Sequence, residues 1–459
     1  MKVPSMSGKN AISRRRFLSR AGRFATGALA VPHVVRSTAL GKAGRAAPSD
    51  RITVGCIGVG NQGRQVMRNF LAQGDAQVVA VCDVKARELA YARRFVDRHY
   101  GGEGCAAYGD FRGLLACEGI DTALIATPDH WHVLIALAAA RAGKDIYLEK
   151  PVGLSLAEDQ ALRAAVRRYG TVFQFGTHQR SDARFHLACE RARNGCIGEL
   201  RRVHVWCPGS RAGGSVQPAP VAAGLDYDMW LGPAPFVPHT EHRCANVFPG
   251  TRDPYKIWPF IGDYCLGWVA GWGVHALDIA LWGGGERLTG PLEIEGTGTF
   301  PAEGACDTAT NWDLVIRFGR GTVMEFRGAP APAAWQTRYA STSDHGTAFE
   351  GTEGWVCVDR SRVSAHPKGL LKSSFRADEA RLYRSVDHVG NFLECVRSRA
   401  ETICPIDGAV AVDTLCQLSA IALRLERKLT WDAEKERFIA DEEANRLLRA
   451  RAMRGPWHL

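Results

Sequence analysis

A glycine-rich segment and one acidic residue are the first features of the chain that suggest chemistry. The segment reads Gly58-Val-Gly-Asn-Gln-Gly63, and Asp83 follows twenty residues later. Glycines at this spacing let the backbone approach a pyrophosphate at a helix N-terminus, and the acid can bind a ribose diol. The sequence therefore predicts a dinucleotide site with these turn residues: Gly58, Gly60, Asn61, Gln62 and Gly63. Asp83 favours NAD over NADP, because a carboxylate repels a 2′-phosphate.

Four further segments carry side chains suited to proton transfer or ligand binding. Three of them are Thr127-Pro-Asp-His-Trp-His132, Glu149-Lys-Pro151 and Gly176-Thr-His-Gln-Arg180. In the fourth, His275 and Asp278 are three residues apart, a spacing that places both on one helix face. A histidine can act as a general base there. No metal site is predicted, because no carboxylate or thiolate at ligand spacing joins the histidines of the first segment.

Strands and helices that alternate along the first half must position these groups. Strand-like apolar runs are predicted at residues 52–57, 78–82, 121–126, 145–148 and 171–175, with helices at 64–71, 130–142 and 155–169. Such alternation predicts a parallel, doubly wound α/β sheet, in which ligands bind beyond the carboxyl ends of the strands. The first three polar segments emerge at that edge.

This combination of motifs resembles the Gfo/Idh/MocA oxidoreductase family, to which glucose–fructose oxidoreductase and inositol dehydrogenase belong. The resemblance rests on the glycine-rich turn with Asp83, on the Thr127–His132 segment and above all on Glu149-Lys150-Pro151. It extends from about residue 51 to the C-terminus. It implies that Lys150 lies between nicotinamide and substrate as a catalytic residue.

The resemblance also assigns cofactor contacts and a domain plan. Thr127 and Pro128 are expected to line the cofactor pocket, and Glu149 to face it. The Rossmann domain is expected to be followed by an α+β domain with an open, mostly antiparallel sheet. The second half carries strand patterns at 200–207, 314–318, 322–326 and 355–358 and helix patterns at 182–194, 388–397 and 409–426. The expected divisions are a signal segment and linker at 1–47, an NAD-binding domain at 51–180 and a substrate and oligomerisation domain at 181–459.

The helix that carries His275 departs from the family pattern. Family members typically have an aspartate four residues before the histidine, but this chain has Gly271 there. We predict that His275 is catalytic, whereas Asp278 either orients its imidazole at the substrate site or is a structural helix residue. His178 and Arg180 follow the sixth strand and are expected to contact the substrate.

The sequence thus favours an NAD-dependent oxidoreductase that acts on the CH–OH group of a sugar, cyclitol or sugar derivative. In this reading His275 accepts the hydroxyl proton while Lys150 stabilises the charge that develops on the same oxygen. One alternative is a redox-neutral NAD-dependent glycosidase or lyase of the same fold. Another is a sugar- or nucleotide-binding protein without catalytic activity, whose site decayed with the loss of the aspartate at position 271.

The N-terminal segment predicts export. Ser13-Arg-Arg-Arg-Phe-Leu18 precedes a short apolar stretch and small residues, a pattern that resembles a twin-arginine signal for folded proteins. We therefore expect the export machinery as a partner and the periplasm as the destination, or the cytoplasm if the signal is unused. Because little free NAD is available outside the cytoplasm, the cofactor is expected to be tightly bound.

The charge and cysteine patterns restrict which other classes of protein the chain can belong to. Residues 1–49 hold ten of the 58 basic residues and no acid, so the rest of the chain has 48 basic and 48 acidic residues and is neutral. This balance argues against nucleic-acid binding. The fourteen cysteines show no Cys-x-x-Cys pair and imply no disulfide framework. No membrane span is predicted, and a homo-oligomer would be compatible with an exposed sheet face.

Overall fold

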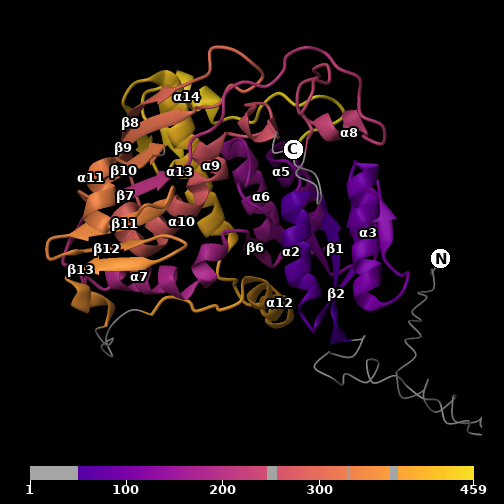
Figure 1. The fold of residues 1–459 in the computed structure, drawn as a ribbon, viewed down its shortest axis with the longest axis horizontal. Helices are drawn as coiled ribbons and strands as arrows, with labels where there is room; N and C mark the ends of the chain where they lie inside the picture. The colour runs from indigo at the N-terminus through magenta and orange to yellow at the C-terminus, as the bar shows by residue number, and fades with distance from the viewer. Residues whose placement is uncertain (1–49, 246–255, 329, 373–380) are drawn as a thin grey trace, which may run out of the picture. The chain divides into compact units, whose positions relative to one another are not determined.

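The first half of the chain folds into a six-stranded parallel sheet in the order β3-β2-β1-β4-β5-β6. Figure 1 labels β1, β2 and β6 of this sheet. Its interior strands β4 and β5 are buried at every residue, as expected for strands covered by helices on both faces. The order reverses between β1 and β4, which confirms the predicted doubly wound sheet. The strands are β1 (Ile52–Ile57), β2 (Ala76–Cys82), β3 (Ala106–Tyr108), β4 (Thr122–Ile125), β5 (Asp145–Leu148) and β6 (Phe173–Phe175).

The computed structural model describes residues 50–245, 256–328, 330–372 and 381–459. The signal segment expected at residues 1–47 lies outside the described residues. The helical segments of the first half are α2 (Asn61–Leu71), α3 (Ala86–Tyr100), α4 (Phe111–Leu115), η3 (Asp129–Trp131), α5 (His132–Arg141), α6 (Leu156–Tyr169) and η4 (His178–Ser181). The start of α6 is fixed by a capping box in which Ser155 and Glu158 satisfy each other's backbone amides.

The second half builds a nine-stranded sheet in the order β13-β12-β11-β7-β10-β9-β8-β14-β15. The described neighbours pair antiparallel except β10 and β7, which run parallel. This confirms the expected mostly antiparallel sheet. Its strands are β7 (Leu200–Cys207), β8 (Leu292–Thr299), β9 (Asn311–Phe318), β10 (Val323–Gly328), β11 (Gly346–Gly351), β12 (Trp355–Val358), β13 (Val363–His366), β14 (Leu429–Asp432) and β15 (Arg437–Phe438).

Two apolar helices, α10 and α13, pack against this second sheet. Side chains alternate between buried and partly exposed along β9, so one face of the sheet carries the apolar residues that meet the helices. The helical segments of this half are α7 (Ala183–Arg193), α8 (Tyr227–Leu231), η5 (Trp258–Phe260), α9 (Trp268–Gly271), α10 (Gly273–Gly284), η6 (Gly285–Leu288), α11 (Ala333–Tyr339), η7 (Lys368–Leu371), α12 (His388–Ser398), α13 (Ile406–Leu425) and α14 (Glu442–Leu447). Among the described residues, α13 alone is long and apolar enough to cross a membrane, but 72% of its apolar window is buried inside the fold.

Segments from the end of the chain pack on the first sheet. Phe392 of α12 makes edge-to-face contacts with Phe70 and Tyr147, at ring-centroid distances of 6.1 and 5.7 Å. In the C-terminal tail, Trp457 meets Trp131 edge-to-face at 4.7 Å. The C-terminal tail thus packs on the body of the protein, and residues beyond 380 help to complete the core of the first sheet.

Candidate active site

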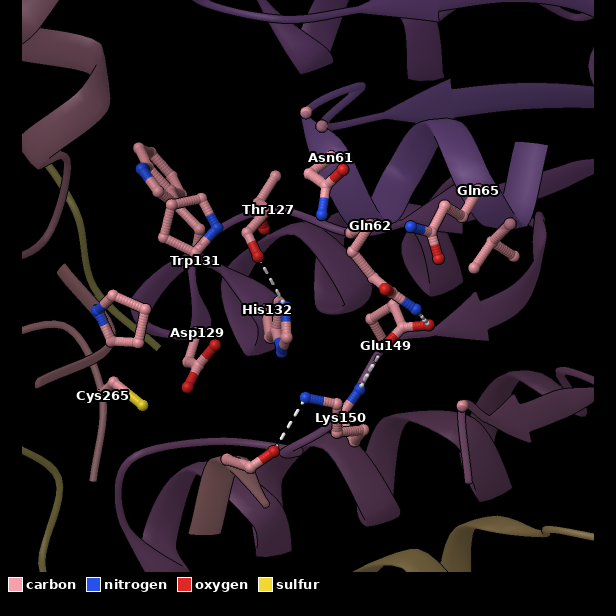
Figure 2. A pocket seen from close by; sticks show the side chains of 18 of the residues that line it. Asn61, Gln62, Gln65, Thr127, Asp129, Trp131, His132, Glu149, Lys150 and Cys265 are labelled. Atoms are coloured by element: carbon pink, nitrogen blue, oxygen red, sulfur yellow. Dashed lines mark hydrogen bonds between the residues drawn. The ribbon is translucent and has the colours of Figure 1, made fainter. Parts of the chain in front are cut away.

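A cavity of about 660 Å³ opens where the order of the first sheet reverses. Its walls come from the carboxyl ends of β1, β2, β4 and β5 and, in the second half, from η5, α9 and α10. Figure 2 shows Thr127, Glu149 and Lys150 directed into it. Most of the predicted site residues line this cavity, so the fold joins groups, such as Gly58 and His275, that are more than 200 residues apart in the sequence.

The glycine-rich turn requires glycine at two positions and leaves the start of α2 uncapped. Gly58 has φ +80°, and a Cβ atom there would lie 2.6 Å from the carbonyl oxygen of Ala126. A Cβ on Gly63 would lie 1.9 Å from the carbonyl oxygen of Gly58, so neither position accepts a side chain. α2 begins at Asn61 without a side-chain cap and without an acid in its first turn. Its amide groups therefore remain available for an anion such as a pyrophosphate.

Asp83 is held at the end of β2 in a position that suits a ribose. Its carboxylate accepts hydrogen bonds from the backbone amides of Val59 and Lys85, both at 2.9 Å. Burial raises the pKa of Asp83 to about 6, against the opposing charge of Lys85. The Lys85 ammonium donates to the backbone carbonyl of Cys244. A carboxylate at this position can accept the hydroxyl groups of a ribose diol but repels a 2′-phosphate. The residues present thus fit NAD better than NADP.

Thr127 and Pro128 form the part of the wall that follows β4. The Thr127 hydroxyl is buried and has no hydrogen-bond partner among the described residues, as expected for a group that awaits a ligand. His132 fixes the backbone behind it: Nε2 lies 3.0 Å from the carbonyl oxygen of Thr127 and Nδ1 lies 2.7 Å from that of Pro151. Thr127 therefore offers an unsatisfied hydroxyl group to a bound nucleotide, and His132 holds the backbone behind it in place.

Glu149 links the cofactor turn to His178. Its Oε1 accepts a hydrogen bond from Gln62 Nε2 at 3.0 Å and lies 3.8 Å from His178 Nε2. Burial alone would raise the pKa of Glu149, but His178 and the charge of Lys150 lower it to about 2. His178 Nε2 also lies 3.0 Å from the Tyr147 hydroxyl. Glu149 is therefore a fixed negative charge beside the predicted cofactor residues.

Lys150 reaches across the cavity to the second half of the chain. Its ammonium donates a hydrogen bond to the carbonyl oxygen of Gly271 at 2.9 Å (Figure 2). A Cβ atom at Gly271 would lie only 2.8 Å from the Trp268 ring. The indole of Trp268 thus fills the space next to residue 271, where the family carries an aspartate side chain. The backbone oxygen of Gly271 contacts Lys150 instead.

His275 lies in the first turn of α10 and lines the same cavity. It is only 9% exposed, and its Nδ1 has no hydrogen-bond partner among the described residues. Burial, together with the positive charges of Lys150 and Arg360, lowers its pKa well below the usual value. The imidazole is therefore neutral at physiological pH and can accept a hydrogen bond through one ring nitrogen.

Arg180 and Asp278 do not line the cavity. They form a buried ion pair in which Arg180 Nη2 lies 2.5 Å from Asp278 Oδ1, and Nε contacts both carboxylate oxygens. The pair links η4 to α10, so Arg180 does not have the expected position at the substrate, and of the two alternatives for Asp278 the structural one agrees with this contact. Arg180 and Asp278 pair because each neutralises the charge of the other in a site closed to solvent.

Several cavity residues were not singled out from the sequence. Gln179 bridges the site, since its amide can donate to the His275 carbonyl at 2.9 Å and accept from Arg360 Nε at 3.2 Å. Arg360 also lies over the Trp272 ring, 4.6 Å from its centroid. Two others are Asp129 and Lys256. Asp129 belongs to a polar segment that follows a strand, which is a signal, but the spacing does not show which side chain of that segment faces the cavity.

Comparisons with known proteins agree with this geometry. The Gfo/Idh/MocA model described as "Oxidoreductase family, NAD-binding Rossmann fold" matches residues 52–177. The companion model, "Oxidoreductase family, C-terminal alpha/beta domain", matches residues 205–316 and 366–459. The cofactor domain is thus an NAD-binding Rossmann domain, and the two models together cover most of the chain.

Curated relatives and solved structures are similar to parts of the chain. A glycosyl hydrolase family 109 protein of Saccharopolyspora erythraea is 38% identical over 112 residues, which cover 24% of each protein. Myo-inositol 2-dehydrogenase of Thermotoga maritima is 28% identical over 39% of this chain and 51% of its own length. The matches therefore span from about a quarter to about half of these relatives. The fold is shared with the WlbA dehydrogenase of Bordetella pertussis, solved with NADH and UDP-GlcNAcA (TM-score 0.57, 16% identity, 82% of this chain and 98% of that one).

Proposed function

Since the chain belongs to the Gfo/Idh/MocA oxidoreductase family, we propose that it oxidises a CH–OH group of a sugar, cyclitol or sugar derivative with tightly bound NAD. One observation carries this proposal: Lys150 and His275, from the two halves of the chain, face one cavity that also contains the dinucleotide turn. Alcohol oxidation requires groups that bind and polarise the reacting hydroxyl next to a hydride acceptor.

Bound NAD supplies the hydride acceptor. The Lys150 ammonium is held at the cavity wall by the Gly271 carbonyl, from which it can donate to the reacting oxygen and stabilise its developing negative charge. His275, kept neutral, is in the correct form to accept a hydrogen bond from the substrate hydroxyl. Trp258, Trp268 and Trp272 line the same cavity and offer apolar faces to the C–H groups of a ring.

The proposal includes export by the twin-arginine route. The paired arginines before Phe17-Leu18 support it, together with the neutral body that follows them. Export of a folded protein would let it carry its nucleotide to the periplasm. Replacing Arg14 and Arg15 together by lysine should leave the full-length precursor inside the cell, as measured by cell fractionation. Equal export of both forms would refute this part of the proposal.

The second candidate is redox-neutral cleavage of a glycoside. The glycosyl hydrolase family 109 names among the relatives favour it, as does the absence of a side chain at Gly271. In that reaction a transient oxidation acidifies a neighbouring C–H and a leaving group departs. Solvent deuterium beside the oxidised carbon of a free-sugar product would support this candidate over net oxidation.

Native mass spectrometry of the purified protein tests the main proposal first. We expect about one NAD or NADH per chain, released on denaturation, and its change of redox state when a panel of polyols, sugars and glycosides is added. The Lys150→Met variant should keep the nucleotide and lose turnover, whereas Lys435→Met, on an exposed side chain, should behave as the unaltered protein. Nucleotide binding without turnover of any compound would favour a binding protein, and no nucleotide binding at all would refute the proposal.

A further inference from the structure

Asp129 is a buried carboxyl group inside the candidate active site. It is the first residue of η3, directly after the Thr127–Pro128 wall, and is only 5% exposed. Its Oδ2 atom has no hydrogen-bond partner among the described residues. Figure 2 shows the side chain in the cavity on the same side as Lys150 and Cys265. A buried polar atom without a partner is uncommon in folded proteins and indicates a group that meets a ligand or a proton.

Charged and titratable groups from four different elements surround this carboxyl group. They are His132 at the start of α5, Lys150 after β5, Lys256 before η5 and the Cys265 thiol before α9. Burial raises the pKa of Asp129, while His132, Cys265 and the two lysines oppose the rise. Burial thus makes the carboxylate more basic than an exposed aspartate, and the lysines keep it able to ionise. A carboxylate with these properties suits a general base.

The cations around His275 oppose its ionisation, whereas the cations around Asp129 favour the ionised carboxylate. The largest charge effects on its ring come from the cations Lys150 and Arg360 and from two further histidines, and all of them lower its pKa. The family position for such a carboxylate is Gly271, where the Trp268 ring leaves no room for a side chain. Formation of an imidazolium ion here would place a new positive charge beside two existing ones in a buried site. His275 is therefore a hydrogen-bond acceptor that resists full protonation.

We propose that Asp129, rather than His275, takes up the proton that the substrate hydroxyl loses. This inference rests on the proposed function. The C–H bond breaks with its electron pair leaving as hydride to oxidised NAD, the O–H bond breaks with its proton going to the Asp129 carboxylate, and a C=O bond forms. Asp129 loses its negative charge in the same step in which the positive charge of the nicotinamide ring disappears. The summed charge beside Lys150 and Lys256 therefore stays constant.

Redox titration of the holoenzyme against pH tests the proton uptake without any substrate. At a fixed potential, the NADH/NAD ratio changes tenfold per pH unit if reduction consumes one proton, and a hundredfold if Asp129 takes up a second. The midpoint potential then moves by about 60 rather than about 30 mV per pH unit. We expect the steeper dependence over part of the range from pH 5 to 8 in the unaltered protein and in His275→Asn. Asp129→Asn should show only the tenfold dependence.

Three controls make the outcome decisive. Asp407→Asn, which alters an exposed carboxylate paired with Arg167, should titrate as the unaltered protein. A tenfold dependence throughout in the unaltered protein would overturn the proposal, as would a hundredfold dependence retained in Asp129→Asn. Circular dichroism and thermal unfolding of each variant establish that it is folded. If Asp129→Asn does not fold, Asp129→Glu keeps the carboxyl group and should retain the steeper dependence, whereas a tenfold dependence in that variant would count against the proposal.

Kinetics with a compound that the polyol and sugar panel identifies gives the second measurement. Asp129→Asn should lower kcat/KM by about 100-fold or more, within the usual range for loss of a general base, and should remove the acidic limb of its pH profile. His275→Asn should keep that limb. If no compound in the panel is oxidised, the proposed function fails, and the redox titration still decides whether Asp129 takes up a proton.

Discussion

Substitution of Gly271 by alanine tests whether the Trp268 ring excludes a side chain at position 271, where the family carries an aspartate. Gly271 is the last residue of α9, and its new Cβ atom would lie 2.8 and 3.0 Å from two carbons of the Trp268 ring. The ring packs edge-to-face on Phe260 at 5.0 Å, so it has little freedom to move away. Overpacking of this kind costs about 1–3 kcal/mol, and the helical preference of alanine over glycine returns at most about 1 kcal/mol. We expect Gly271→Ala to lower the free energy of unfolding by about 1 kcal/mol.

Chemical denaturation of matched variants measures this effect. Gly408→Ala is the control, because that glycine also lies in a helix and its Cβ would make only ordinary contacts, the nearest at 3.5 Å from Arg180. It should gain about 0.5 kcal/mol. In a Trp268→Leu background, Gly271→Ala should no longer destabilise the protein, so the double variant should be less destabilised than the sum of the two single variants. If Gly271→Ala proves as stabilising as Gly408→Ala, the argument from Trp268 is refuted.

Three further predictions follow from the site and the core. Lys150→Met should lower kcat at least 100-fold while the Kd for NAD changes only a few-fold, as measured by single-turnover absorbance and calorimetry; a parallel loss of affinity would contradict the catalytic role. The pKa of Asp83, raised to about 6 by burial, predicts that NAD affinity falls up to about tenfold from pH 7 to pH 5 as the carboxylate is protonated, and that Asp83→Asn abolishes this pH dependence. Asp413 and Asp159 are buried together on α13 and α6, and burial raises the pKa of Asp413 to about 6. Burial and the neighbouring Asp413 also raise the pKa of Asp159. Because the folded protein then holds protons on this pair more tightly than the unfolded chain does, stability should fall as pH rises above about 4, with about 3 kcal/mol of the fall coming from Asp413, and Asp413→Asn should make the fall shallower in thermal unfolding.

The sequence predicted most of the first half because its signals are local. The strand Asp145–Leu148 has the bounds expected from its apolar pattern, as does Leu200–Cys207 at the start of the second half. The expected helix at 130–142 instead divides into the η3 turn and α5, which begins at His132. The division follows from a tertiary contact, since the His130 amide donates to the Tyr264 carbonyl from far along the chain.

The composition of the site depended on contacts that no local pattern contains. Arg180 and Asp278 each looked available for a substrate, but they neutralise each other across 98 residues of sequence. The Trp268 ring excludes a side chain at Gly271, and this exclusion is visible only once the backbone of α9 is placed. Asp129 lay within a recognised polar segment, but its burial depends on residues near 256 and 265. Spacing therefore identified the edge of the sheet where chemistry occurs, whereas packing decided which side chains reach it.

The contact of α12 with the first sheet also sets an order of events during synthesis. Phe392 is fully buried against Phe70 and Tyr147, and loss of such a side chain costs about 3–5 kcal/mol. When the ribosome has released only the first 180 residues, this apolar surface has nothing to cover it. The nucleotide-binding half should therefore become stable only after residue 398 has emerged from the exit tunnel. A nascent chain stalled before that point should be digested rapidly by protease, and one stalled well beyond it should resist.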